Sequence, residues 1–293
     1  MKITDCQIHD VGPMWDWLGE NAEVQSRIMG ELAIAYLDAV GVDRVVLFCG
    51  SDIGLAGWMA QNAPERIAFV PQIEAESPDI DAAIAAAKQR HKAGQLGVRV
   101  QISWPMDGSE LRRLEAGGWD PVFAACERHQ VPLFILIVGS LPLVSGIVAR
   151  FPRLTLIVDH IGMRQPPMDV TDDPPFARLG ELLDLARHPN VHVKLCGLPS
   201  MSREPFPYRD TEPALRRIVD AFGAGRLLWG SDATRFAGRI GIHRFHHPLT
   251  LQDYPGKHHY ADALFNIRES PVLTAAEKAE ILGGALQRVL DWP

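Results

Sequence analysis

The chain has 293 residues, of which 47% are hydrophobic and 22% charged, a composition typical of a globular protein with a large core. Its formal net charge of −7 argues against binding to nucleic acids or to anionic membranes, because both need a basic surface. The opening MKITDCQIHD holds no apolar run of signal-peptide length, so we expect a cytoplasmic protein. The 4 cysteines form no CxxC pair, which predicts reduced thiols.

Eight short runs rich in Val, Ile and Leu follow one another along the chain with little polar alternation. Such runs are typical of parallel strands that are buried on both faces. They cover residues 3–8, 42–48, 67–73, 96–102, 131–138, 154–158, 191–196 and 226–230.

The segments between these runs carry helix signals. Ser77 is placed to cap a helix that ends before Gly94. Residues 211–222 are apolar at helical spacing, and Thr274 with Glu277 forms a capping box at the start of the last helix. Strands that alternate with helices predict a parallel sheet.

Eight such units predict an α/β fold in which the sheet closes into a (β/α)8 barrel, with residues 1–293 as a single domain. An open doubly wound sheet is the alternative, but no GxGxxG follows the first strand. The uncharged stretch 131–149 approaches membrane-spanning length. Because Pro132 and Pro142 interrupt it, we expect a strand, a turn and a helix.

Polar side chains stand where several predicted strands end, and in such a barrel catalytic groups lie at those ends. The first strand ends with Gln7 and His9, which point the same way because side chains alternate along a strand. The sixth is followed by Asp159 and His160, and the eighth by Asp232.

These motifs resemble the amidohydrolase-related family of the amidohydrolase superfamily. The resemblance rests on Asp-His-Ile-Gly at 159–162, Leu-Trp-Gly-Ser-Asp at 228–232 and the ending Ile-Leu-Gly-Gly-Ala-Leu-Gln-Arg-Val-Leu at 281–290, in that order. It covers essentially the whole chain and implies a barrel hydrolase.

The family pattern implies a divalent metal held by His-x-His on the first strand, by ligands on middle strands and by an Asp on the eighth. Here Gln7 replaces the first histidine, and Leu136 stands where the fifth-strand histidine is expected. We therefore expect no metal cofactor. If zinc or manganese does bind, the remaining ligands are His9, His160 and Asp232.

The sequence is also similar to the lactonases that resemble 2-pyrone-4,6-dicarboxylate lactonase, which hydrolyse without a metal. That resemblance implies that Asp232 is the general base which activates water, and that His160 and His9 polarise the scissile carbonyl. The amide of Gln7 can still donate a hydrogen bond to a substrate.

Arginines predict an anionic substrate, such as a small carboxylated lactone. Arg164, Arg203 and Arg235 lie on the loops after the sixth to eighth strands, and Arg99 lies in the fourth strand. Arginine binds carboxylates through two parallel hydrogen bonds. Alternatively, Arg99 braces the barrel through ion pairs and the loop arginines are solvated.

Three functions remain open from the sequence. The first is metal-independent hydrolysis of an anionic lactone, and the second is metal-dependent hydrolysis or non-oxidative decarboxylation. The third is a non-catalytic barrel that binds a small acid. Trp15 and Trp17 are placed to cover the site from the first loop. The sequence leaves open whether the chain forms a homo-oligomer.

Overall fold

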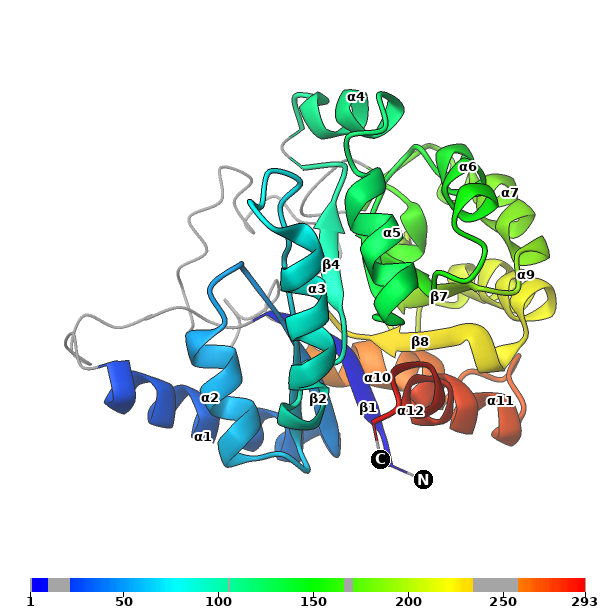
Figure 1. Cartoon of the computed structure of the whole chain (residues 1–293). Helices are drawn as coiled ribbons and strands as arrows, with labels where there is room; N and C mark the ends of the chain where they lie inside the picture. Colours follow the sequence, from blue (N-terminus) through cyan, green and yellow to red (C-terminus); the bar gives the residue numbers. More distant parts are fainter. Residues whose placement is uncertain (1, 10–21, 105, 166–170, 234–257, 293) are drawn as a thin grey trace.

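The computed structural model describes residues 2–9, 22–104, 106–165, 171–233 and 258–292, apart from the side chains of residues 22, 23, 25, 26 and 29. Trp15, Trp17 and Arg235 lie outside the described residues. Strands and helices alternate along the chain as the sequence predicts (Figure 1).

All eight predicted strands are present. They are β1 (Thr4–His9), β2 (Arg44–Cys49), β3 (Ile67–Pro71), β4 (Val98–Gln101), β5 (Leu133–Leu136), β6 (Leu156–Val158), β7 (Val191–Cys196) and β8 (Leu227–Gly230). The helices are α1 (Ala22–Val40), α2 (Gly54–Asn62), α3 (Ile80–Gln89), α4 (Ser109–Glu115), α5 (Asp120–His129), α6 (Pro142–Arg150), α7 (Leu179–Asp184), α8 (Leu198–Met201), α9 (Glu212–Phe222), α10 (Tyr260–Arg268), α11 (Ala275–Ala279) and α12 (Ala285–Leu290).

The strands close into a parallel barrel. Ladders join β1 to β3 and β4 to β8, and isolated parallel bridges from Phe69 to Gln95 and from Gln72 to Arg99 connect the two sets. The barrel closes where β8 meets β1, a junction that we call the seam. There the Asp232 amide donates to the Gln7 carbonyl over 2.8 Å. The predicted (β/α)8 barrel is therefore confirmed.

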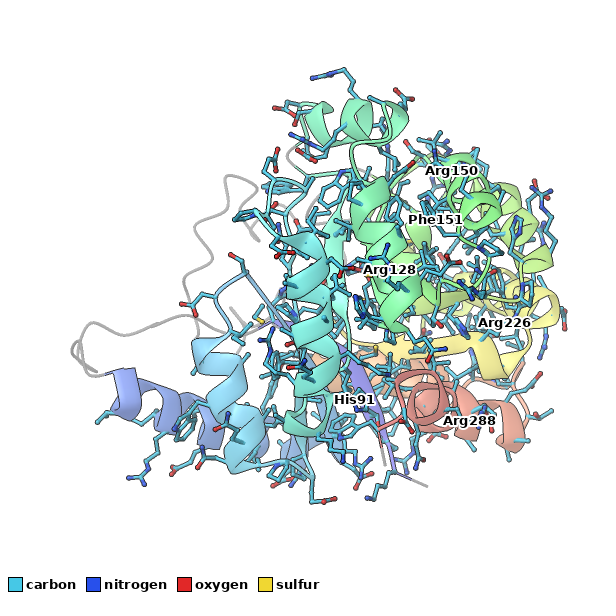
Figure 2. All side chains as sticks on the ribbon, viewed as in Figure 1. His91, Arg128, Arg150, Phe151, Arg226 and Arg288 are labelled. Carbon is cyan, nitrogen blue, oxygen red and sulfur yellow. The ribbon has the colours of Figure 1, made fainter. Side chains whose placement is uncertain are left out.

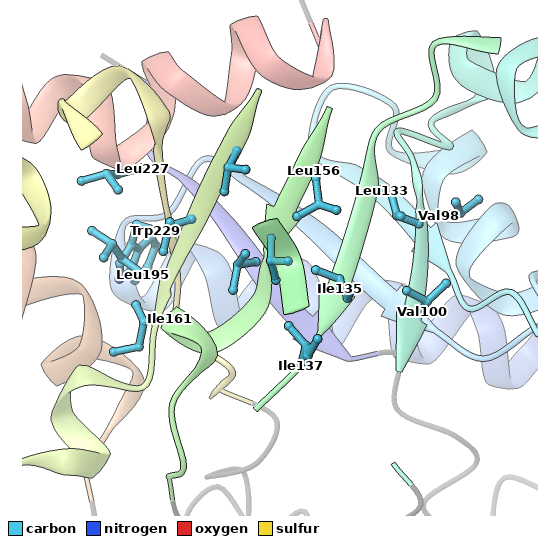
Figure 3. Packing of buried hydrophobic residues seen from close by; sticks show 14 of the residues in the cluster. Val98, Val100, Leu133, Ile135, Ile137, Leu156, Ile161, Leu195, Leu227 and Trp229 are labelled. Carbon is cyan, nitrogen blue, oxygen red and sulfur yellow. The ribbon is translucent and has the colours of Figure 1, made fainter. Parts of the chain in front are cut away.

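Side chains alternate between the barrel interior and the surrounding helices. Val98, Val100, Leu133 and Ile135 belong to the large cluster that packs strands against helices (Figure 3). Phe134, between the last two, belongs to a smaller cluster inside the barrel. Burial of each large aliphatic side chain contributes roughly 1.5–3 kcal/mol, so these two layers hold the barrel together.

Charged side chains cover the outer helical layer. Arg150 of α6 pairs with Asp120, and Arg288 of α12 pairs with Glu280 (Figure 2). The stretch 131–149 forms β5, a turn and most of α6, as predicted. Among the described residues, no helix is both long enough and apolar enough to cross a membrane.

Helix ends follow the sequence signals with one exception. The capping box of Thr274 and Glu277 is present, and Gly94 ends the turn after α3 with φ 94°. The residue that caps α3, however, is Asp79, whose side chain accepts from the Ala82 amide at 2.9 Å. The prediction of Ser77 as this cap was wrong because the helix begins later than Pro78 suggested.

Gly230 lets β8 lie against β1. A Cβ atom at this position would lie 2.8 Å from Gln7 Cβ and 3.2 Å from the Gln7 amide nitrogen. The close contact between β8 and β1 that positions Asp232 therefore requires a residue without a Cβ atom at position 230.

We predict that Gly230→Ala lowers the free energy of unfolding by ~1–3 kcal/mol, because overpacking forces the seam apart. Urea unfolding followed by circular dichroism measures this. Gly146→Ala is the control, since a Cβ there meets nothing within 4 Å and the residue lies inside α6. That change should stabilise by ~0.5–1 kcal/mol. Equal effects of the two changes would contradict the role assigned to the seam.

Candidate active site

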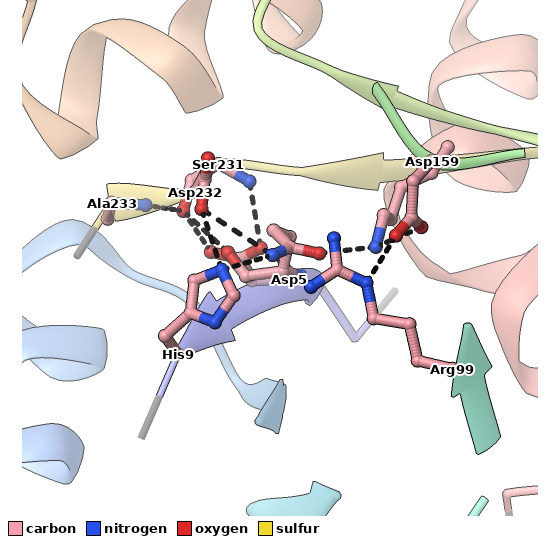
Figure 4. A network of polar contacts seen from close by, with 9 residues as sticks. Asp5, His9, Arg99, Asp159, Ser231, Asp232 and Ala233 are labelled. Atoms are coloured by element: carbon pink, nitrogen blue, oxygen red, sulfur yellow. Dashed lines mark hydrogen bonds and ion pairs between the residues drawn. The ribbon is translucent and has the colours of Figure 1, made fainter. Parts of the chain in front are cut away.

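Three of the polar residues expected at the strand ends meet at one seam of the barrel. Gln7 Nε2 lies 2.9 Å from His9 Nε2 and 3.5 Å from Asp232 Oδ1. His9 Nε2 is 3.5 Å from the same carboxylate oxygen. Figure 4 shows His9 and Asp232 facing each other from β1 and from the end of β8. The structure thus joins a carboxamide, an imidazole and a carboxylate.

The backbone takes an unusual conformation at two of the three strand ends that carry candidate catalytic groups, those of β6 and β8. His160, Ile161 and Asp232 have φ values of 53°, 51° and 57°. This left-handed region is disfavoured for residues with a Cβ, and such strain costs of order 1–3 kcal/mol per residue. Strained residues cluster at functional sites, so the conformation supports a role for these turns.

Asp5, which the sequence analysis did not single out, holds the Asp232 turn in place. Its Oδ1 accepts hydrogen bonds from the amides of Gln7 and Ser231, each over 2.9 Å. The Ser231 hydroxyl donates to Oδ2 over 2.5 Å. Burial raises the pKa of Asp5 to about 6, although the hydrogen bonds from Ser231 and Gln7 lower it. The position of Asp5 inside the apolar run 3–8 was the sequence signal that could have identified it.

Lys194 of β7 is a second missed residue, and its side chain is fully buried. Its Nζ lies 2.6 Å from Asp159 Oδ1 and donates to Gln7 Oε1. The ammonium also sits 3.8 Å from the centre of the Phe48 ring, a cation–π contact. A lysine within the apolar run 191–196 was the signal that could have identified it.

Arg99 braces the same carboxylate. Its Nε lies 2.7 Å from Asp159 Oδ2, and its side chain is 3% exposed (Figure 4). Burial raises the pKa of Asp159, but the charges of Lys194 and Arg99 outweigh burial, so the pKa is lowered. Nη2 of Arg99 has no hydrogen-bond partner among the residues that the structure describes. Arg99 therefore braces the barrel through an ion pair, as the alternative prediction stated, and its Nη2 remains as one buried donor without a described partner.

The two loop arginines that the structure describes are both exposed. Arg164 is exposed after the turn that follows β6. Arg203 is exposed beyond α8 and pairs with Asp173. Leu136 ends β5, and its carbonyl accepts hydrogen bonds from the amides of Ile102 and Ser103 over 2.8 and 3.1 Å.

A metal fits only one side of this site. Within the described part of the chain, the ligand atoms of His160, Cys196 and Asp232 lie within 4.8 Å of one another, and all three residues are buried. Sulfur, imidazole and carboxylate are donors that zinc prefers. This set has Cys196 in place of the expected His9. On the first strand the Lys194 ammonium lies against Gln7 and would repel a second cation.

We predict that Asp5→Asn changes the dependence of stability on pH. With a pKa of about 6 in the folded protein and 3.8 as the ordinary value, the folded state binds more protons between these pH values. Stability then falls as pH rises from about 4 to 6, by roughly 3 kcal/mol from this group alone.

Asn does not titrate, so the variant should gain stability relative to the original protein across this interval. Urea unfolding at several pH values between 4 and 7 gives the difference. Parallel curves for the two proteins would contradict the raised pKa.

Comparisons with known proteins place the chain in a family. A sequence model described as amidohydrolase matches residues 5–292. The chain is 36% identical over 128 residues to an L-fucono-1,5-lactonase of Burkholderia ambifaria, a region that covers 42% of each protein. It is 30% identical over 154 residues to a 4-sulfomuconolactone hydrolase of Hydrogenophaga intermedia, covering 52% of this chain and 48% of that protein. The alignments thus span about half the length of these curated relatives.

Solved structures share the fold. An amidohydrolase from Burkholderia multivorans with bound zinc superposes with a TM-score of 0.71 at 20% identity, over 100% of both chains. A probable 2-pyrone-4,6-dicarboxylic acid hydrolase from Acinetobacter baumannii, with citric acid bound, gives 0.69 at 16% identity, over 99% of this chain and 100% of that one. Since the family model spans residues 5–292 and the barrel carries the strand-end groups described above, the chain belongs to the amidohydrolase family.

Proposed function

We propose that this protein hydrolyses a small carboxylated lactone without a metal, with Asp232 as the general base. One observation carries the proposal. A protein carboxamide bridges the imidazole and the carboxylate at the seam, with Gln7 Nε2 2.9 Å from His9 Nε2 and 3.5 Å from Asp232 Oδ1. The buried Lys194 behind it supplies positive charge in the region where the family pattern implies a cation.

Asp232 is suited to take a proton from water in this arrangement. Its carboxylate is 4% exposed and its turn is held by Asp5 through Ser231. The hydroxide attacks the lactone carbonyl, and His160 with His9 stabilises the developing oxyanion. The acyl–oxygen bond then breaks, and the ring oxygen receives the proton from Asp232. Lactone and water are converted into a hydroxy acid, so atoms and charges balance.

The names of the curated relatives support a cyclic ester as substrate. Both are hydrolases of lactones, at 36% and 30% identity over the aligned halves. Two cations, Lys194 and Arg99, face the single carboxylate of Asp159. The unpartnered Nη2 of Arg99 is a buried donor that a substrate carboxylate would satisfy. Arg164, on the loop after β6, is a further candidate to bind the substrate carboxylate. Arg203 and Arg235 are weaker candidates for the same contact.

A metal-dependent hydrolase or decarboxylase is the second candidate, favoured by the close approach of His160, Cys196 and Asp232. These residues would hold zinc, which when bound supplies Lewis-acid activation of a carbonyl and of water. Asp232 would then be a ligand, and the base would have to be another group.

We predict that purified protein contains much less than one zinc or manganese per chain and that a chelator leaves lactone hydrolysis unchanged. Elemental analysis and rates on a panel of carboxylated lactones measure both. Cys196→Ser separates the two candidates, because only metal-dependent chemistry needs the sulfur ligand. Stoichiometric metal, lost together with activity in this variant, would overturn the metal-independent proposal.

We predict that Asp232→Asn lowers kcat by ~10²–10⁴-fold, the usual contribution of a general base. Binding of the hydroxy-acid product, measured by calorimetry, should change little. Asp120→Asn is the control, since Asp120 lies on α5 and pairs with Arg150 on the outside of the barrel. If no lactone is hydrolysed although acids still bind, the protein is a non-catalytic binding barrel.

A further inference from the structure

Lys194 is a fully buried lysine whose neighbours restrict what it can do. Burial of a charged ammonium is unfavourable unless the group is paired, and here the partners are Asp159 Oδ1 at 2.6 Å and Gln7 Oε1. Arg99 holds the other oxygen of Asp159 at 2.7 Å. An ammonium has three donors and no acceptor, so each hydrogen bond that it makes must go to an acceptor such as an oxygen.

This restriction fixes the orientation of Gln7. The oxygen and nitrogen of a carboxamide have nearly the same shape, and hydrogen bonding decides which way the group turns. Because the Lys194 ammonium can only donate, Gln7 must direct Oε1 toward it. The NH2 group then points the other way, toward His9 Nε2 at 2.9 Å and Asp232 Oδ1 at 3.5 Å.

The orientation of Gln7 in turn decides where His9 carries its proton. An amide nitrogen donates and does not accept, so His9 Nε2 must accept. Neutral histidine has one N–H, which is then on Nδ1. The competing arrangement, in which Nε2–H donates to Asp232 at 3.5 Å, requires Gln7 to turn its NH2 away. Lys194 prevents that turn.

We propose that Lys194 is a positioning residue of the active site, which acts through Gln7 to hold His9 in the Nδ1–H tautomer. Two consequences follow for the hydrolysis proposed above, on which this part of the inference rests. Nδ1–H becomes the donor that His9 offers to a substrate oxygen. The lone pair of Nε2 is occupied by Gln7, so Asp232 keeps the proton it takes from water until the ring oxygen receives it.

The tautomer can be measured without any substrate. Long-range ¹H–¹⁵N correlation spectra of the labelled protein distinguish Nδ1–H, Nε2–H and imidazolium histidines. The chain has 11 histidines, so a His9→Gln spectrum identifies the signals of His9. We expect a protonated Nδ1 and an unprotonated Nε2. A protonated Nε2 in the original protein would overturn the proposal.

Gln7→Glu tests the mechanism without removing Lys194. The two side chains have the same length, and the carboxylate still accepts from the ammonium, but it has no hydrogen to donate to His9. We expect the proton of His9 to move to Nε2. An unchanged tautomer in this variant would show that Gln7 does not control His9.

Lys194→Met removes the ammonium and keeps an unbranched side chain. Gln7 is then free to turn, so we expect His9 to lose its single tautomer. Kcat should fall ~10–100-fold, the size of effect found when a residue that orients a metal-bound histidine is removed, with little change in KM. If this variant does not fold, Gln7→Glu still decides the question.

Gln7→Met is a second test of the same step, because it removes the donor and the acceptor of Gln7 while Lys194 remains. It should release the tautomer as Lys194→Met does. A single Nδ1–H tautomer retained in both methionine variants would overturn the proposal. If the tautomers behave as expected and no lactone is hydrolysed, the positioning role stands and the proposed hydrolysis fails.

Discussion

The ion pair between Lys194 and Asp159 is the interaction on which the interior of this barrel depends. It joins β7 to the residue that follows β6, at 2.6 Å and in complete burial. Removing one partner of such a pair typically costs ~3–5 kcal/mol, because the other charge stays buried. Arg99 adds a third strand, β4, to the same carboxylate. The backbone turn at His160 begins at Asp159, so the ion pair also anchors a candidate catalytic group in its left-handed conformation.

Two buried aspartates show how surroundings give one residue type opposite properties. Asp159 faces Lys194 and Arg99, and its pKa is lowered despite burial. Asp5 forms no ion pair with any described residue, and burial raises its pKa to about 6. The first therefore serves as a permanent negative charge. The second serves as an acceptor that ties Ser231, and through it Asp232, to β1.

The strands could be predicted because runs of Val, Ile and Leu buried on both faces leave a direct trace in the sequence. The meeting of Gln7, His9 and Asp232 was also within reach, since strand ends share one face of a barrel. Lys194 and Asp5 stand out in the sequence as charges inside apolar runs, but their roles could not be predicted, because a single sequence does not reveal which residue pairs with a buried charge. The last helix is another example. Gly283 interrupts it where a Cβ would lie 2.3 Å from the Lys2 carbonyl, a contact between the two ends of the chain.

Asp232 is the point at which the two proposed chemistries exclude each other. Its Oδ1 lies 3.5 Å from Gln7 Nε2, and one of its carboxylate oxygens lies within 4.8 Å of the ligand atoms of His160 and Cys196. A carboxylate bound to zinc gives up electron density to the metal and becomes a poor base. A carboxylate that binds no metal keeps a lone pair that can take a proton from water. The Lys194 ammonium, which donates to Gln7 Oε1, would repel a cation placed on the first-strand side of Asp232, whereas His160 and Cys196 lie on the side where a metal fits. Among the described residues Lys194 forms no hydrogen bond with His9 or Asp232, so it would bear on the proposed proton-transfer mechanism only through Gln7 and through its charge.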